Sequence, residues 1–194
     1  TLKCNLAIED ADALFGRPMG IPKTGVFGLY DLIGIDLMAD VVVSLGNILP
    51  ADDAFHAVGA ANPAIAAMIE AGFTGDKGKG GFYCLDGTKR MARQFAGYEG
   101  NDMPPLNPAK TKLPAAAIAA AEAAARQDEP LFMLLDGHDD QAKFCRRVLG
   151  RILHYAASLV PSVTTTPQDI DDAMKLGFNW QRGPFEMIDA IGPQ

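Results

Sequence analysis

The sequence has little of what several classes of protein need. Its 194 residues carry a formal net charge of −7, so no basic excess exists to pair with nucleic-acid phosphates or with an anionic membrane. No apolar run approaches the roughly 18 residues that a membrane-spanning helix needs, and no signal peptide is recognisable. We therefore expect a protein that binds neither nucleic acid nor membrane.

Cysteine is also scarce. Cys4, Cys84 and Cys145 are odd in number and far apart, and none forms a C-x-x-C pair. This usage predicts neither a disulfide framework nor a metal site, and it fits a reducing, cytoplasmic compartment. Because the chain starts at Thr1 rather than Met and stops abruptly at Gln194, we also expect a fragment of a longer polypeptide.

The three histidines, His56, His138 and His154, do not form a recognisable catalytic set. A histidine general base needs an orienting carboxylate, and a nucleophile if one is used, and no spacing in the sequence points to such partners. We interpret His154 as a partly buried packing residue. The sole tryptophan, Trp180, lies in a turn and is expected at an interface or at the edge of the core.

Apolar residues recur mainly at helical spacing, and no stretch alternates with a period of two for long enough to indicate a strand. The fold class is therefore mainly α. Gly16 is expected to end the first helix in the left-handed conformation, Asp36 to cap the third, and Asn62 to cap the fourth. The predicted helices cover 6–15, 27–33, 36–49, 63–71, 88–95, 115–126, 138–160 and 167–176, with a further one from 184. The longest, over 138–160, carries an apolar stripe of Phe144, Val148, Leu149, Ile152, Tyr155 and Leu159.

One pattern occurs twice: an acidic helix start, a glycine, a turn, and a second helix that carries Asp-x-Ile-Gly. The first copy reads EDADAL over 9–14 and GVFGLYDLIG over 25–34, and the second reads DIDDAM over 169–174 and GPFEMIDAIG over 183–192. Asp31 and Asp189 occupy the same place in this alignment. We interpret them as carboxylates with a shared structural role, such as accepting hydrogen bonds from N–H groups of the turn.

A glycine-rich segment runs from Gly75 to Gly81 and carries Lys77 and Lys79. Loops rich in free backbone N–H groups can cradle phosphate. The segment matches neither G-x-x-x-x-G-K-[ST] nor G-x-G-x-x-G after a strand. The favoured interpretation is a tight structural turn before a buried Phe82–Tyr83 anchor, and contact with a phosphate-bearing ligand is the alternative.

Together these pieces resemble the C-terminal helical domain of 3-hydroxyacyl-CoA dehydrogenases. The resemblance covers about two thirds of the chain. It is carried by Pro18-Met19-Gly20, Phe27 with Asp31-Leu32-Ile33-Gly34, Gly75-Asp76-Lys77 with Gly81-Phe82-Tyr83, DIDDAMKLG over 169–177 and GPFE over 183–186. It implies two packed copies of that domain: 1–96 with its N-terminal helix truncated, a linker over 97–113, and 114–194 truncated at its C-terminal end.

The resemblance implies that the parent enzyme oxidises L-3-hydroxyacyl-CoA with NAD. In this family the catalytic His–Glu pair and the NAD fingerprint lie in a Rossmann domain, so no catalytic residue is carried over to this chain, and no cofactor or metal is expected in it alone. The implied partners are the acyl-CoA substrate, Rossmann and enoyl-CoA hydratase domains of the parent chain, and a second copy in a homodimer. Candidate substrate-binding residues are Met19, Gly20, Lys77 and Lys79.

Two other functions stay open. The paired helical units could be a non-catalytic dimerisation or interaction module. A weaker alternative is an independent binder of a phosphate ligand that uses Gly75 to Gly81. Between the two copies, we expect the first to face substrate and the second to buttress it.

Overall fold

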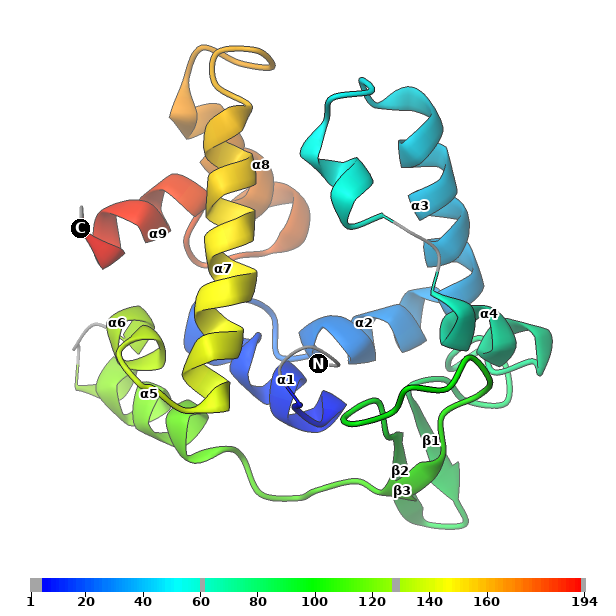
Figure 1. Cartoon of the computed structure of the whole chain (residues 1–194). Coiled ribbons are helices and arrows are strands. Elements are labelled where there is room, and N and C mark those ends of the chain that lie inside the picture. Colours follow the sequence, from blue (N-terminus) through cyan, green and yellow to red (C-terminus); the bar gives the residue numbers. More distant parts are fainter. Residues whose placement is uncertain (1–4, 60–61, 127–129, 193–194) are drawn as a thin grey trace.

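A computed structural model describes residues 5–59, 62–126 and 130–192 (Figure 1). Cys4 lies outside the described residues. The fold is mainly helical, as predicted. Its elements in chain order are α1 (Ile8–Leu14), η2 (Arg17–Met19), α2 (Gly25–Ile33), α3 (Ile35–Ile48), η3 (Ala54–Ala57), α4 (Pro63–Glu70), β1 (Tyr83–Asp86), β2 (Lys89–Arg93), β3 (Leu106–Pro108), α5 (Ala115–Ala125), α6 (Pro130–Leu135), α7 (Asp140–Ser158), α8 (Pro167–Phe178) and α9 (Pro184–Ile191).

Several helix ends follow from capping chemistry, and the prediction for Asn62 is confirmed. The Asn62 side chain accepts a hydrogen bond from the Ala64 N–H at 3.0 Å, with Pro63 as the first residue of α4. Asp139 caps the long helix α7 in the same way, accepting from the Ala142 N–H at 2.7 Å. A side-chain acceptor at these positions satisfies an N–H group that the helix itself leaves unpaired.

Three predicted helix ends are wrong in detail. Asp36 lies in the first turn of α3, and the capping position is Gly34 at φ 116°. Gly16 has φ −154°, an extended conformation, and the left-handed residue of this loop is Gly20 at φ 72°. Helix α8 continues through Gly177 and ends at Asn179 with φ 55°, because asparagine tolerates the left-handed conformation that ends many helices.

The helix predicted over 88–95 is wrong, because most of this segment forms strand β2 of a three-stranded antiparallel sheet in the order β1-β2-β3. Asp86 pairs with Lys89, so Gly87 and Thr88 form a two-residue hairpin turn, with Gly87 at φ 61°. A glycine at the first position of a two-residue hairpin turn is a recognised signal, since that position then needs a positive φ. Strand β3 comes from the predicted linker and pairs with β2, with Ala92 opposite Asn107.

The buried apolar residues form two clusters. The first core joins both ends of the chain; Leu14 of α1, Met19 of η2, Leu149 of α7 and Met187 of α9 belong to it. The second core gathers around Phe82 with Ile8, Ile35, Met68 and Phe95. Phe27 packs against both clusters. The predicted first and second domains therefore share a core.

The helix predicted over 115–126 is confirmed by the alanine-rich helix α5. It buries Ala117, Ala120 and Ala123 and packs closely against α6. Helix α6 was not predicted.

Cys145 is buried and Cys84 partly so, and both are free thiols. No helix within the described ranges is long and apolar enough to cross a membrane.

An aspartate carboxylate, partly buried at Asp12 and buried at Asp171, joins each of two helix pairs. The two oxygens of Asp12 on α1 accept from the Phe27 N–H at 2.8 Å and the Gly28 N–H at 3.0 Å, at the start of α2. Asp171 on α8 accepts from the Phe185 N–H at 2.8 Å and the Glu186 N–H at 3.1 Å, at the start of α9. Both carboxylates satisfy N–H groups that a helix start leaves without intrahelical partners.

The glycines before these helices fit the same geometry. A Cβ atom at Gly25 would lie 2.4 Å from Asp12 Cγ, and one at Gly183 would lie 2.3 Å from Asp171 Cγ. A side chain at either position would displace the carboxylate. The aspartate on the first helix and the glycine before the second therefore act as one unit in each pair.

We predict that Asp12→Ala and Asp171→Ala each lower the free energy of unfolding by about 1–3 kcal/mol, because each leaves two N–H groups at a helix start without their acceptor. Urea denaturation followed by circular dichroism measures the loss. Asp40→Ala, on the exposed face of α3, is the matched control and should change stability by less than about 0.5 kcal/mol. Losses no larger than that of the control would contradict this role.

Candidate functional site: an apolar groove beside helix α7

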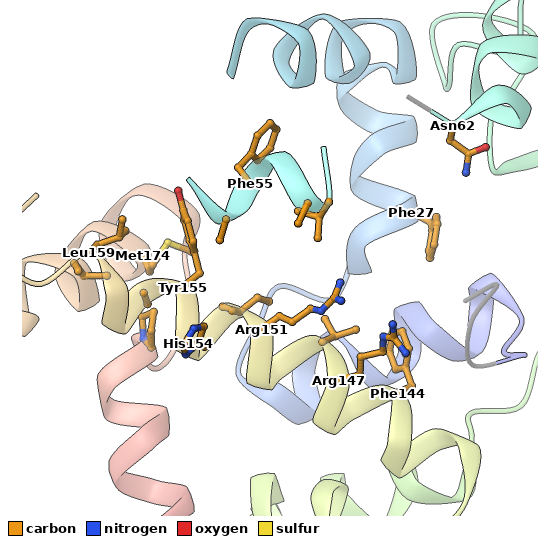
Figure 2. Close-up of a pocket in the computed structure, with 18 of the residues that line it drawn as sticks. Phe27, Phe55, Asn62, Phe144, Arg147, Arg151, His154, Tyr155, Leu159 and Met174 are labelled. Carbon is orange, nitrogen blue, oxygen red and sulfur yellow. The ribbon is translucent and has the colours of Figure 1, made fainter. Parts of the chain in front are cut away.

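An open groove of about 920 Å³ lies between α7 and the elements of the first half of the chain (Figure 2). One wall comes from α2, η3, α4 and the segments flanking the sheet, and the other from α7, α8 and the start of α9. The lining is almost entirely apolar. Its residues include Phe27, Phe55, Val58, Ile65, Phe82 and Phe95 on the first wall and Phe144, Val148, Ile152, Tyr155, Leu159, Ile170, Met174 and Pro184 on the second.

Helix α7 has two apolar faces. One carries Ala142, Cys145, Leu149, Leu153 and Ala156, which are buried against the rest of the molecule. The other carries most of the stripe predicted from the sequence, namely Phe144, Val148, Ile152, Tyr155 and Leu159. Of these only Phe144 is fully buried. Most of the predicted stripe therefore faces the groove. Leu149 and Phe144 belong to the first core, and Phe144 also lines the groove.

The polar groups of the groove are mainly basic. Arg147 and Arg151 are exposed and project from α7 into the space in front of α2 (Figure 2). Neither has an ion pair or hydrogen bond with any described residue. Tyr155 points toward η3 and donates a hydrogen bond to Asp53 Oδ2 at 3.3 Å. Burial and the nearby Asp53 charge raise the pKa of the Tyr155 phenol.

The groove offers binding rather than acid–base chemistry. His154 lines it but is exposed, which contradicts the predicted packing role. Within the described part of the lining there is no carboxylate to orient this imidazole. Among the residues that the structure describes, no three His, Cys, Asp or Glu side chains gather closely enough to hold a metal ion.

The four substrate-binding candidates lie in two separate places, and the groove contains none of them. Met19 is 1% exposed and belongs to the first core. The Gly20 carbonyl accepts from the Gln181 N–H at 2.7 Å, so the Pro-Met-Gly loop docks onto the turn that holds Trp180. Trp180 packs at the edge of the first core, as predicted. These contacts favour a structural role for Met19 and Gly20.

Lys77 and Lys79 lie on the glycine-rich loop, where each has a partner. The Lys77 ammonium is 2.7 Å from Asp36 Oδ1, and both side chains are substantially exposed. The Lys79 ammonium donates to the Ala71 carbonyl at 3.0 Å. Exposed pairs of this kind are weak, so both ammonium groups could be redirected to an anionic ligand at small cost.

Asp31 holds the glycine-rich loop in place. Its two oxygens accept from the Phe82 N–H at 2.8 Å and the Tyr83 N–H at 2.7 Å, and its own carbonyl accepts from the Asp76 N–H at 2.8 Å. A Cβ atom at Gly81 would lie 2.0 Å from Asp31 Oδ1. The interpretation as a tight turn before a buried Phe82–Tyr83 anchor is thus confirmed. The N–H groups of Gly75, Asp76, Gly78, Lys79 and Gly81 already donate to backbone carbonyls, so they are not available to a phosphate.

The predicted equivalence of Asp31 and Asp189 does not extend to their contacts. Asp31 is 3% exposed, whereas Asp189 is exposed on α9. The glycine-rich segment that Asp31 binds has no counterpart in the second half of the described chain. Asp12 and Asp171 are the carboxylates whose hydrogen bonds match. The sequence alignment had placed Asp12 opposite Asp172, one position later.

The fold is a mainly helical module with an apolar groove beside its longest helix. The family model for the 3-hydroxyacyl-CoA dehydrogenase C-terminal domain matches residues 2–84 and 144–194. The chain therefore belongs to the 3-hydroxyacyl-CoA dehydrogenase family through its C-terminal domain.

Relatives support the same assignment. The chain is 34% identical over 95% of its length to a protein of Rickettsia prowazekii (strain Madrid E), and 37% identical over 91% to one of Rickettsia felis (strain ATCC VR-1525 / URRWXCal2). Both carry the provisional name fatty acid oxidation complex trifunctional enzyme. A Bacillus subtilis (strain 168) protein, provisionally named 3-hydroxyacyl-CoA dehydrogenase, is 30% identical over 98% of the chain.

The chain spans about a quarter of the length of these relatives, with 24%, 23% and 23% of each covered. No solved structure matches it significantly.

Burial raises the pKa of Asp31 to about 6, above its ordinary value of 3.8. The folded state therefore holds this proton more tightly than the unfolded state. The contribution of Asp31 to stability is full below about pH 4 and is lost as the pH rises through about 6. We predict that the stability gap between wild type and Asp31→Asn is larger near pH 4 than near pH 7.

Urea denaturation at the two pH values measures that gap, with Asp189→Asn as the exposed control. A gap that is equal at both pH values, or larger at neutral pH, would contradict the raised pKa.

Proposed function

We propose that this chain is the helical substrate-binding and interdomain portion of an NAD-dependent L-3-hydroxyacyl-CoA dehydrogenase, and that it is inactive alone. The observation that carries the proposal is that both ranges matched by the family model contain a helix pair joined by an aspartate carboxylate, Asp12 in one and Asp171 in the other. Residues 1–96 and 114–194 would then be two copies of one domain, joined by 97–113.

The parent enzyme would oxidise the 3-hydroxyl of an acyl-CoA to a ketone, with NAD as the hydride acceptor. The glycine-rich segment does not fit NAD, since the N–H groups of Gly75, Asp76, Gly78, Lys79 and Gly81 already donate to backbone carbonyls. A separate domain of the parent chain would bind the cofactor and supply the base. This portion would close over the acyl-CoA and exclude water from the reacting atoms.

Lys77 and Lys79 are the residues that we propose to contact the phosphates of coenzyme A. Two exposed ammonium groups on a loop that is rigidly held by Asp31 suit an anion whose position must be fixed.

The free thiols of Cys84 and Cys145 are compatible with a cytoplasmic location.

A second candidate function is a dimerisation or interaction module. Its support is helix α3, whose apolar side chains Leu37, Val41, Val43 and Ile48 are exposed and whose only buried residue is Ile35. An exposed apolar face of this extent is typical of a surface that another protein unit covers. The two functions are compatible within one parent enzyme.

The first test is turnover. We expect residues 1–194 to give no oxidation of NADH with acetoacetyl-CoA, measured by absorbance at equal molar concentration beside the parent polypeptide, because the base and the cofactor site lie elsewhere. The parent polypeptide is the positive control. Turnover by the isolated chain that survives further purification would contradict the proposal.

The second test separates substrate binding from a purely associative module. We expect acetoacetyl-CoA to bind the chain in isothermal titration calorimetry and the double variant Lys77→Ala/Lys79→Ala to weaken binding by about tenfold or more, since two contacts to phosphate are lost. Lys112→Ala, an exposed lysine elsewhere, is the matched control. Absent binding, or equal affinity in all three proteins, would favour the interaction module.

A further inference from the structure

We propose that Cys84 is a site of oxidation by peroxides and that Arg93 receives the oxyanion that forms on its sulfur. The inference goes beyond the proposed function, since it concerns a covalent change in the small sheet and not a contact with substrate. It starts from a buried cation that has no anionic partner among the residues that the structure describes.

Arg93, at the end of β2, is buried with most of its hydrogen-bonding capacity unused. The residue is only 2% exposed. Its Nη1 donates to the Pro104 carbonyl at 2.9 Å, and its guanidinium carbon lies 4.3 Å from the centre of the Phe73 ring. Nε and Nη2 are buried and have no hydrogen-bond partner within the described ranges. Unpaired donors on a buried cation are costly, so this arrangement favours a further, anionic acceptor.

The register of the sheet places Cys84 beside this guanidinium. Cys84 pairs with Met91, and Arg93 is two residues further along β2. Because side chains alternate between the two faces of a strand, Cys84 and Arg93 lie on the same face. A diagonal neighbour across two strands is within reach of a side chain as long as arginine. The sulfur of Cys84 is therefore the group on which an acceptor for Arg93 can be formed.

The two cysteines that the structure describes differ in access to small oxidants. Cys84 is partly exposed, whereas Cys145 is 0% exposed. Burial raises the pKa of the Cys84 thiol, and the Arg93 charge opposes that rise. The thiolate is the attacking species, so the first oxidation is slow at neutral pH. Arg93 is therefore expected to act mainly on the oxidised sulfur, once it carries an oxygen that can be ionised.

Two equivalents of hydrogen peroxide convert the thiol to a sulfinate. In the first step the sulfur forms a bond to one peroxide oxygen while the O–O bond breaks, and the other oxygen takes the thiol proton and leaves as water. The sulfur loses two electrons and becomes a sulfenic acid. In the second step the sulfenate attacks another peroxide in the same way, and a second water leaves. Each step oxidises the sulfur and reduces one peroxide.

The sulfinate supplies what the thiol lacks. Its two oxygens share a negative charge and accept hydrogen bonds, and charged hydrogen bonds from a guanidinium to such oxygens are stronger than neutral ones. A thiol sulfur is only a weak acceptor. Oxidation of Cys84 therefore gives Nε and Nη2 of Arg93 the acceptor that they do not have in the reduced protein.

The test treats residues 1–194 with hydrogen peroxide and measures the sulfinate fraction by peptide mass spectrometry, which resolves the cysteines from one another. We expect Cys84 to reach the sulfinate while Cys145 stays a thiol. We expect Arg93→Met to lower the sulfinate fraction at Cys84 by about fivefold or more at the same peroxide dose, because the charged hydrogen bonds to the product are lost. Arg93→Lys keeps the charge and should recover part of that loss.

Lys89→Met is the matched control. Lys89 is an exposed cation on the same strand and the same face as Arg93. Its ammonium is solvated and screened, so its loss should leave the oxidation of Cys84 as in wild type. A fall of the same size in Lys89→Met and Arg93→Met would overturn the assignment to Arg93.

Circular dichroism checks that each variant is folded, and a comparison within the wild-type protein needs no variant. Parallel samples with and without dimedone, which traps sulfenic acid, give the ratio of sulfinate to sulfenate at Cys84. We expect this ratio to be at least about threefold higher in the folded chain than in urea. Equal ratios, equal sulfinate fractions in wild type and folded Arg93→Met, or a Cys84 that stays a thiol while exposed methionines are oxidised would each overturn the inference.

Discussion

The structure depends on a carboxylate that accepts backbone hydrogen bonds at the start of a neighbouring helix. Asp12 and Asp171 each accept two backbone N–H groups that the following helix cannot satisfy by itself. Each carboxylate lies so close to Gly25 or Gly183 that a side chain there would displace it. The two helices of each pair are therefore held in one relative orientation. These placements bring the Gly20 loop onto the turn at Gln181, and the first core closes around both ends of the chain.

Local chemistry predicted most of the helices and few of the contacts between them. Asn62 caps its helix, and the alanine-rich helix forms where composition favours it. The β-hairpin was missed although Asp86-Gly87 signals it, because its short strands carry charged residues and too little apolar alternation to outweigh the helical reading. The pairing of Asp12 with Asp171 could not be predicted from aligned letters, because the loops that follow the two aspartates differ in length.

The candidate site shows the same limit. Met19 and Lys77 were singled out together because they lie in family motifs, yet one is in the core and the other is in an exposed ion pair. The groove is built by residues as distant as Phe27 and Met174 and has no motif of its own. The periodicity of α7 did identify its apolar residues, but periodicity gives the face of a helix and cannot say whether a packed core or an open groove lies beside it.

In the function that we propose, a helical portion with an apolar groove and two groove-facing arginines would contribute to catalysis by binding and positioning the substrate. The central claim is therefore that the parent dehydrogenase needs residues 1–194 for substrate and not for its cofactor. The most direct measurement is kcat/KM for L-3-hydroxyacyl-CoA oxidation by the parent polypeptide before and after their deletion, together with the Kd for NAD. The account predicts a loss of at least about 100-fold in kcat/KM with the NAD Kd retained, and an unchanged kcat/KM would contradict it.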